Sequence, residues 1–261
     1  MKQKKSFHWT RVVLAAVIVF FYIPIAYTIL FSFNASRSLT TFSGFSLRWY
    51  EKMFSSSVTM GAIGTTFAIA ILATVISTFI GTITVIGLSR CSKPLRRAVR
   101  TANDLPIMNP DIVTAIGLLM FFATLEVSKG FLTLLLAHIA FDTPYVLFSV
   151  LPRLRQMNPN TYEAALDLGC HPLSALWKVI LPEVMPGIVT GALLSFTMSL
   201  DDFVISYFTS STDQNLSMIV YSAARRGVEP TMYALSTIMF VVILLLLLAV
   251  NRRSSLEDMK N

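Results

Sequence analysis

Two adjacent aspartates, Asp201 and Asp202, lie in a segment that is otherwise apolar enough to cross a membrane. An aspartate near the centre of a span costs about 2.5–3.5 kcal/mol to insert, and each Leu, Ile, Phe or Val returns only about 0.3–0.6 kcal/mol. Such acids are expected to face a protein interior or a water-filled cavity. Ser195 and Ser199 lie at helical spacing from Asp202, so one polar stripe runs along the segment. We therefore expect these four residues to line a path for a cation.

Two further acids fall in apolar segments, and each has a functional and a structural interpretation. Asp111 follows an Asn-Pro pair and either lines the same path or simply caps a helix. Asp142 lies four residues after His138, which suits either substrate contact or an internal pair of buried side chains. Pro106 and Pro110 are expected to interrupt the helix near Asp111 and to free carbonyl groups toward a cavity.

The elements that must carry these residues are membrane helices. The chain has 261 residues, of which 54% are hydrophobic and only 13% charged, whereas soluble domains carry about 25% charged residues. We predict an all-α polytopic membrane protein, with residues 1–261 forming a single transmembrane domain. Its six expected spans are residues 12–33, 62–89, 105–125, 131–151, 187–208 and 234–250.

The basic residues orient these spans. Of the 21 Lys and Arg residues, fifteen fall in the N-terminus, the second and fourth connections and the C-terminal tail, and six fall in the other connections. Because basic residues accumulate on the cytoplasmic side, both termini are expected in the cytoplasm of a bacterial cell membrane. The net charge of +7 is then explained without a nucleic-acid partner.

Several functions are not supported by the sequence. It contains no glycine-rich phosphate-binding loop of the G-x4-G-K-[ST] type, so we expect the chain to bind no ATP, Mg²⁺ or other cofactor through this motif. The two cysteines, Cys91 and Cys170, are expected to be free cytoplasmic thiols, and the three scattered histidines predict no metal site. No nucleophile–base arrangement indicates an intramembrane enzyme.

Residues 153–182 form a polar connection with a helical pattern of its own. Asn160 or Thr161 is expected to cap a helix that carries Glu163 in its first turn, where a negative charge is favourable. Gly169 supplies a stop that can adopt positive φ. A second apolar pattern follows and is expected to end at Pro182.

The spacing in this connection resembles the EAA loop of ABC-importer permeases, whose pattern is E-A-A-x3-G-x9-I-x-L-P. The only departure is Val179 in place of isoleucine. The resemblance implies the type I (MetI-like) permease fold and a cytoplasmic helix–turn–helix that docks into a separate ATPase subunit. The residues that match are Glu163, Ala164, Ala165, Gly169, Val179, Leu181 and Pro182.

Further segments resemble permeases of the spermidine/putrescine (PotC-type) importer family. They are the stretches around Asp111, Glu163–Gly169 and Ser199–Ser206. The resemblance implies a non-enzymatic transport subunit with a homologous PotB-type permease, two ATPase subunits that bind ATP and Mg²⁺, and an extracellular or periplasmic polyamine-binding protein as partners. Alternatives are an ABC permease for another solute, such as an amino acid or metal complex, and a proton-coupled secondary transporter that uses His138 and the acids as a relay.

Overall fold

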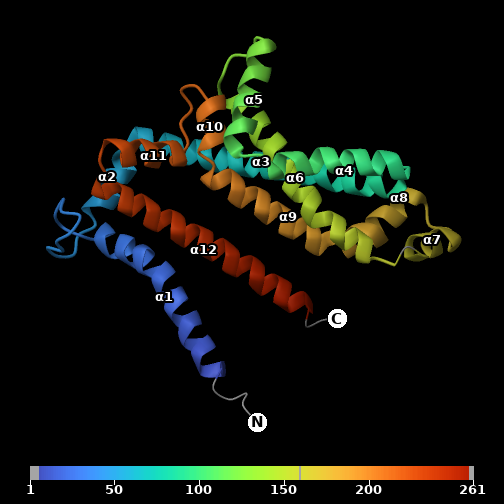
Figure 1. Ribbon diagram of the computed structural model, residues 1–261, viewed down its shortest axis with the longest axis horizontal. Coiled ribbons are helices and arrows are strands. Elements are labelled where there is room, and N and C mark those ends of the chain that lie inside the picture. The colour runs from blue at the N-terminus through green and yellow to red at the C-terminus, as the bar shows by residue number, and fades with distance from the viewer. Residues whose placement is uncertain (1–5, 159, 259–261) are drawn as a thin grey trace. The chain divides into compact units, whose positions relative to one another are not determined.

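The computed structural model describes residues 6–158 and 160–258, and within these ranges the chain is almost entirely helical (Figure 1). An isolated antiparallel bridge pairs Asn34 with Phe45. Among the described residues, five helices are long and apolar enough to cross a membrane, or six if one bent pair counts as a single span. The all-α prediction is therefore confirmed. The elements are α1 (Ser6–Ser32), α2 (Arg48–Ser55), α3 (Ser57–Arg90), α4 (Lys93–Met108), α5 (Asp111–Thr124), α6 (Phe131–Gln156), α7 (Asn160–Asp167), α8 (Pro172–Ala175), the π-helical segment η1 (Leu176–Ile180), α9 (Leu181–Asp201), α10 (Val204–Thr209), α11 (Leu216–Arg226) and α12 (Pro230–Asp258).

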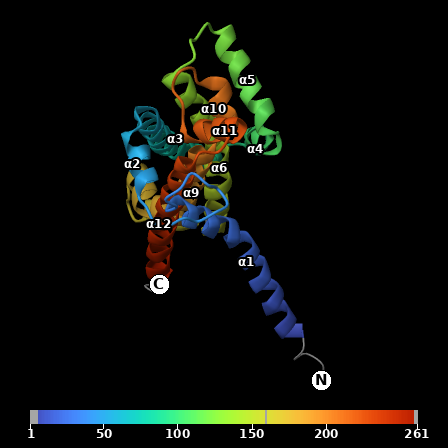
Figure 2. The ribbon, with the colours of Figure 1, turned by 90° about the vertical axis from the view of Figure 1, so that its left-hand side faces the viewer.

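The chain divides into two compact units. The first combines the N-terminal segment up to residue 60 with the C-terminal segment from residue 222, and the second comprises residues 61–221. In the first unit α1 contacts α12, and the ring of Tyr27 on α1 meets that of Tyr233 on α12 edge-on. From this contact the two helices diverge toward the two ends of the chain (Figure 2). The indole of Trp49 on α2 is buried and donates a hydrogen bond to the Asn34 carbonyl. In the same unit Lys52 forms an exposed ion pair with Glu229 and holds the pKa of that carboxyl below its usual range.

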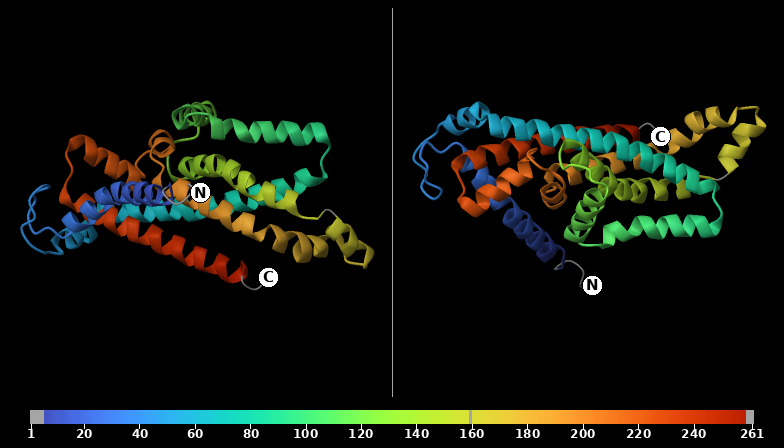
Figure 3. Two further views of the ribbon diagram at one scale, coloured as in Figure 1. Left: turned by 60° about the horizontal axis from the view of Figure 1, so that its bottom comes forward. Right: turned by 90° about the horizontal axis from the view of Figure 1, so that it is seen from above.

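The second unit is built on α3, α6 and α9, and α6 and α9 make its most extensive contact (Figure 3). Its core is a cluster of branched apolar side chains contributed by these three helices and η1. Lipid tails are as apolar as these side chains, so the hydrophobic effect does not drive the helices together. Their association depends on close packing, which small residues at the interface allow. The cluster consists of Val85, Leu88, Val146, Leu147, Val150, Ile180 and Val184.

Glycines provide the close approach between these helices. A Cβ on Gly81 of α3 would lie 2.7 Å from Cγ1 of Val146, and one on Gly187 of α9 would lie 2.9 Å from the Arg153 side chain. The hydroxyl of Ser149 on α6 also donates to the Gly187 carbonyl at 2.9 Å. The backbones of α3 and α9 can therefore approach α6 only because these positions lack side chains.

An interruption is predicted in the third span, residues 105–125, and the structure confirms it at Pro110 but not at Pro106. The chain forms α4 and α5, whose axes bend by 111° at Asn109–Pro110. Pro110 takes an extended conformation and α5 starts directly after it, whereas Pro106 lies inside α4 without ending it. Pro106 costs α4 the hydrogen bond that an N–H at this position would donate to the Ala102 carbonyl, yet α4 continues to Met108, so only Pro110 acts as a break.

The fifth predicted span, residues 187–208, differs at both ends. The helical run starts at Pro172, well before Gly187, and stops at Asp201; the short helix α10 then follows. Asp202 itself is extended, with ψ of 124°. In the same unit α10 packs against α5, and Ile205 is buried with Phe122 and Phe141.

Candidate functional site

The connection predicted to couple the permease to an ATPase forms two short helices at one end of the α6–α9 pair (Figure 3). α7 ends in a Schellman arrangement: the Cys170 N–H bonds to the Ala165 carbonyl, and the Gly169 N–H bonds to that of Leu166. Gly169 has φ of +83°. The predicted glycine stop is therefore confirmed, because a residue with a Cβ is strained in this conformation.

The start of α7 differs from the prediction. Asn160 and Thr161 lie inside the helix, and neither caps it from outside. Asn158 has that role, since its side-chain oxygen accepts from the Asn160 N–H at 3.0 Å and its carbonyl accepts from Thr161. The helix thus begins earlier than the sequence predicts, and Glu163 remains in its first turn.

Pro182 does not end the second helix, contrary to the prediction. The π-helical segment η1 leads directly into α9, and the Leu181 N–H bonds to the Leu176 carbonyl five residues earlier. A proline in a helix clashes with the carbonyl four residues before it. The wider π turn, common at functional sites, relieves this crowding and lets the helix continue to Asp201.

The loop presents both acidic and apolar groups to its surroundings. Glu163 and Ala164 are exposed, Ala165 is half-buried, and Val179 and Leu181 are half-buried where η1 meets α9, with Pro182 exposed. Leu168, Leu173 and Trp177 are also strongly exposed, at 89%, 64% and 65%. On its inner side the loop is anchored by Tyr162, whose ring lies 4.1 Å beneath the Arg90 guanidinium of α3. The exposed apolar residues form a patch suited to a protein partner.

The polar stripe predicted on the fifth span faces the interior of the unit. The Ser195 hydroxyl donates to Oδ2 of Asp142 on α6 at 3.0 Å, and the Ser77 hydroxyl of α3 lies 2.9 Å from Ser195. Nδ1 of His138 on α6 lies 2.6 Å from the Ser199 hydroxyl. All five side chains are buried. Ser77, Ser195 and Asp142 thus join α3, α9 and α6, and His138 with Ser199 makes a second buried polar contact between α6 and α9.

Asp202 has a local structural role that the sequence did not indicate. Its carboxylate accepts hydrogen bonds from the backbone N–H groups of Ile205 and Ser206, the first turn of α10, and from the Ser206 hydroxyl. Because that hydroxyl donates to Asp202, it accepts from Nε2 of His138 at 3.0 Å. The side-chain amide of Asn215 completes the arrangement by donating to the Asp202 carbonyl and to Ser206.

The predicted path residues therefore separate into two groups. Asp142, Ser195 and Ser199 are buried and Asp202 is mostly buried. They form two sets of contacts: Asp142 with Ser195, and Ser199 with Asp202 by way of His138 and Ser206. Asp111, the first residue of α5, and Asp201, the last of α9, are exposed. Asp201 lies on the side of Thr197, which is also exposed, as the helical spacing predicts. The assignment of these residues to a substrate path stays a prediction.

Ser77 belongs to the first of these sets and Asn215 to the second, and neither is predicted from the sequence. Ser77 lies among many small and hydroxyl residues of the second span, and Asn215 lies in a connection, so neither has a distinctive spacing. Oδ1 of Asp142 is buried without a hydrogen-bond partner in the described structure. No cluster of three or more potential metal-ligating side chains occurs in residues 6–158 and 160–258.

The helical bundle, the broken spans and the protruding two-helix loop define a multi-pass membrane protein with the fold of type I ABC-importer permeases. A bacterial ABC transporter involved in alginate import has the same fold, with a TM-score of 0.76 at 14% identity over 97% of this chain and 98% of that one. The MetNI methionine ABC transporter matches with a TM-score of 0.64 at 19% identity, over 76% of this chain and 96% of that one.

Sequence comparison identifies the family. Residues 77–254 match the binding-protein-dependent transport system inner membrane component family, and the chain belongs to it. The match extends across both compact units, so their division is not a boundary of the family domain. The putrescine transport system permease PotI of Escherichia coli K12 is 36% identical over 243 residues, covering 88% of this chain and 85% of that protein. The spermidine/putrescine permease PotC of Haemophilus influenzae is 39% identical over 231 residues, covering 88% and 90%.

Proposed function

We propose that this chain is the membrane permease subunit of an ATP-driven importer that moves putrescine or spermidine into the cell. The observation that carries the proposal is the similarity, at 36–39% identity over 88% of the chain, to permeases named for these two polyamines. The EAA-like pattern and the exposed loop that contains it supply the means of coupling. The chain itself is not the enzyme; a separate ATPase subunit hydrolyses ATP with Mg²⁺.

The loop from 153 to 182 is the proposed docking element for that ATPase. The Schellman turn at Gly169 ends α7 within the loop, and the stacking of Arg90 on Tyr162 anchors the loop to α3. Glu163 and the exposed apolar side chains Leu168 and Trp177 remain available to a partner. A rigid, exposed helix pair of this kind transmits closure of an ATPase pair to α6 and α9, because both helices continue directly from the loop.

The proposed substrate contacts are the exposed acids. Polyamines are flexible polycations, and Asp201 and Asp111 are the two predicted path residues whose carboxylates are exposed in this chain. We assign Asp142, Ser195, Ser199 and Asp202 a supporting role: the contacts of Ser195 with Asp142 and of Ser199 with His138 fix α9, and Asp202 fixes the α9–α10 break next to Asp201. Asp201 is thus the residue on which the substrate assignment chiefly rests.

The assembly we propose contains a second, PotB-type permease, two ATPase subunits and an external polyamine-binding protein. Both termini lie in the cytoplasm, since fifteen of the 21 basic residues fall on the side that carries the loop. The long apolar faces of α1 and α12 contact lipid or the second permease.

The experiment that tests the function is uptake by proteoliposomes that contain the co-purified transporter and an external binding protein. We expect ATP-dependent uptake of labelled putrescine or spermidine, competed by the unlabelled polyamine and not by a neutral amino acid. Uptake that needs a proton gradient and no ATP would favour the secondary-transporter alternative. Failure of both polyamines to compete with another cationic solute would assign the permease to that solute instead.

A further inference from the structure

A groove of about 510 Å³ lies between α4 and α6, with Leu88 of α3 among its lining residues. It is separate from the buried polar contacts and from the proposed docking loop's exposed face. Its lining combines two arginines, Arg100 and Arg155, with a long apolar wall. Of the segments given a function above, only the start of the docking loop, at Arg155 and Gln156, reaches this groove.

The charged groups of the groove favour an anion. Arg100 and Arg155 are exposed, and neither forms an ion pair or hydrogen bond with any part of the chain that the structure describes. Asp104 is the acid that lines the groove, and it forms no ion pair with either arginine. The groove thus carries a net positive charge, which repels a polycationic substrate and attracts a phosphate group.

The polarity of the groove changes along its length. α4 begins at the same end of the unit where α6 finishes, because Arg90, just before α4, stacks on Tyr162, just after α6. Arg155 marks this end on α6, and Leu147 lies eight residues away, or about 12 Å along the helix axis. Exposed apolar side chains, Phe148 at 65% and Met108 at 81%, continue the wall beyond the arginines. A basic end followed by an apolar wall is complementary to a lipid with an anionic headgroup.

We propose that this groove binds an anionic phospholipid of the inner leaflet. Arg100 and Arg155 bind its phosphate, and an acyl chain lies against Leu147, Phe148, Leu151 and Met108. Basic pockets between membrane helices on the cytoplasmic side bind such headgroups through the same combination of charge and apolar surface. The lipid would contact Arg155 at the end of α6, where the loop proposed to dock the ATPase begins.

The test uses the full transporter reconstituted in phosphatidylcholine nanodiscs and titrated with phosphatidylglycerol, with bound lipid counted by native mass spectrometry. The variant is Arg100→Gln combined with Arg155→Gln. Loss of two basic contacts is expected to weaken phosphatidylglycerol binding roughly thirtyfold. Phosphatidylglycerol binding no stronger than phosphatidylcholine binding in the unaltered transporter would overturn the proposal.

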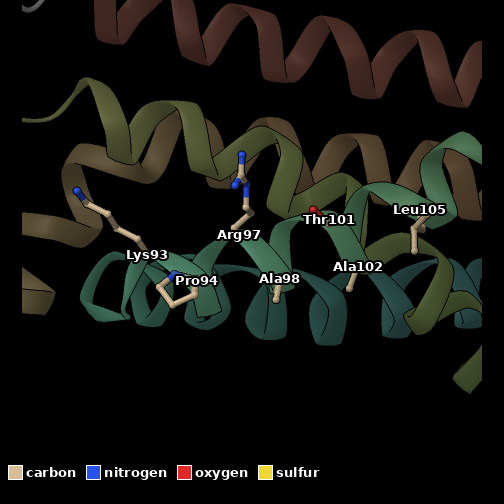
Figure 4. Close-up of a pocket in the computed structure, with 7 residues that line it drawn as sticks. All are labelled: Lys93, Pro94, Arg97, Ala98, Thr101, Ala102 and Leu105. Atoms are coloured by element: carbon tan, nitrogen blue, oxygen red, sulfur yellow. The ribbon is translucent and has the colours of Figure 1, made fainter.

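A matched control removes the same charge from the first turns of α4, outside the lining of the groove. Lys93 and Arg97 line a second groove, of about 920 Å³, that only residues of α4 border (Figure 4). They form no ion pair or hydrogen bond with the described residues either. Lys93→Gln with Arg97→Gln is expected to leave binding within about twofold of the unaltered transporter. An equal loss in both double variants would mean that diffuse surface charge, and not the groove, attracts the lipid.

A second measurement separates the lipid from other occupants and does not depend on the arginine variant folding. A photo-crosslinking amino acid in place of Phe148 is expected to label phospholipid in the assembled transporter. Labelling of the second permease subunit in place of phospholipid would overturn the proposal. Because binding is measured without transport, its outcome is independent of whether polyamines are the substrate.

Discussion

The Ser195 hydroxyl of α9 donates a hydrogen bond to Oδ2 of Asp142 on α6 at 3.0 Å, deep within the second unit. Oδ1 of the same carboxyl has no partner in the described structure, so Ser195 supplies most of the polar contact that Asp142 receives. The two helices that continue from the coupling loop are therefore joined by a buried polar contact as well as by glycine-mediated packing.

The first prediction concerns this contact. Ser195→Ala leaves the buried Asp142 carboxyl without its donor and should destabilise the protein by about 1–3 kcal/mol. The measurement is the apparent unfolding temperature of the purified transporter in detergent. Thr197→Ala is the control on the exposed side of α9, where the hydroxyl bonds only to its own helix, and its effect should stay within about 0.5 kcal/mol. Equal shifts would show that the contact contributes nothing specific.

The second prediction concerns packing between α3 and α6. Gly81→Ala places a Cβ 2.7 Å from a methyl carbon of Val146, whose branched side chain is buried and cannot turn away. The expected destabilisation is about 1–3 kcal/mol, again read from the unfolding temperature. Gly87→Ala, on the same helix, meets no atom within 4 Å and should be neutral or stabilising by up to about 1 kcal/mol. A stable Gly81→Ala protein would contradict the close packing.

The third prediction separates the two adjacent aspartates. Asp202→Ala removes the acceptor of the Ile205 and Ser206 N–H groups and should lower the unfolding temperature, corresponding to about 1–3 kcal/mol. Asp201→Asn should leave stability within about 0.5 kcal/mol. It should reduce polyamine uptake roughly tenfold, as expected for a loss of about 1.4 kcal/mol in cation binding. Normal uptake by Asp201→Asn would remove Asp201 from the substrate path.

The fourth prediction concerns energy coupling. Glu163→Arg reverses the charge of an exposed residue in the first turn of α7, where a positive charge is also unfavourable with the helix dipole. We expect uptake to be abolished and ATPase activity to be uncoupled from transport, although the subunits still co-purify. Glu51→Arg on α2, also exposed but far from the loop in sequence, should retain coupling. Normal transport by Glu163→Arg would rule out the docking assignment.

Local patterns in the sequence were sufficient for the features that depend on neighbouring residues. Apolar segments of roughly 20 residues predict membrane helices because lipid leaves no other way to satisfy backbone polar groups, and the helical fold follows. Gly169 predicts a positive-φ stop because glycine alone adopts that conformation without strain. The EAA-like spacing predicts the permease family, to which the chain belongs.

The tertiary structure decided which side of α9 its polar stripe faces. Helical spacing places Ser195, Ser199 and Asp202 on one stripe, but a spacing carries no information on what packs against it. The stripe meets His138 and Asp142 of α6, so it is buried, and the exposed carboxylate is Asp201 one residue away. Likewise, the sequence pattern predicts that a helix ends at Pro182. In the structure the π turn before Pro182 makes room for its ring, and the helix continues. These outcomes depend on contacts between segments distant in the chain and on backbone geometry, which residue types alone do not specify.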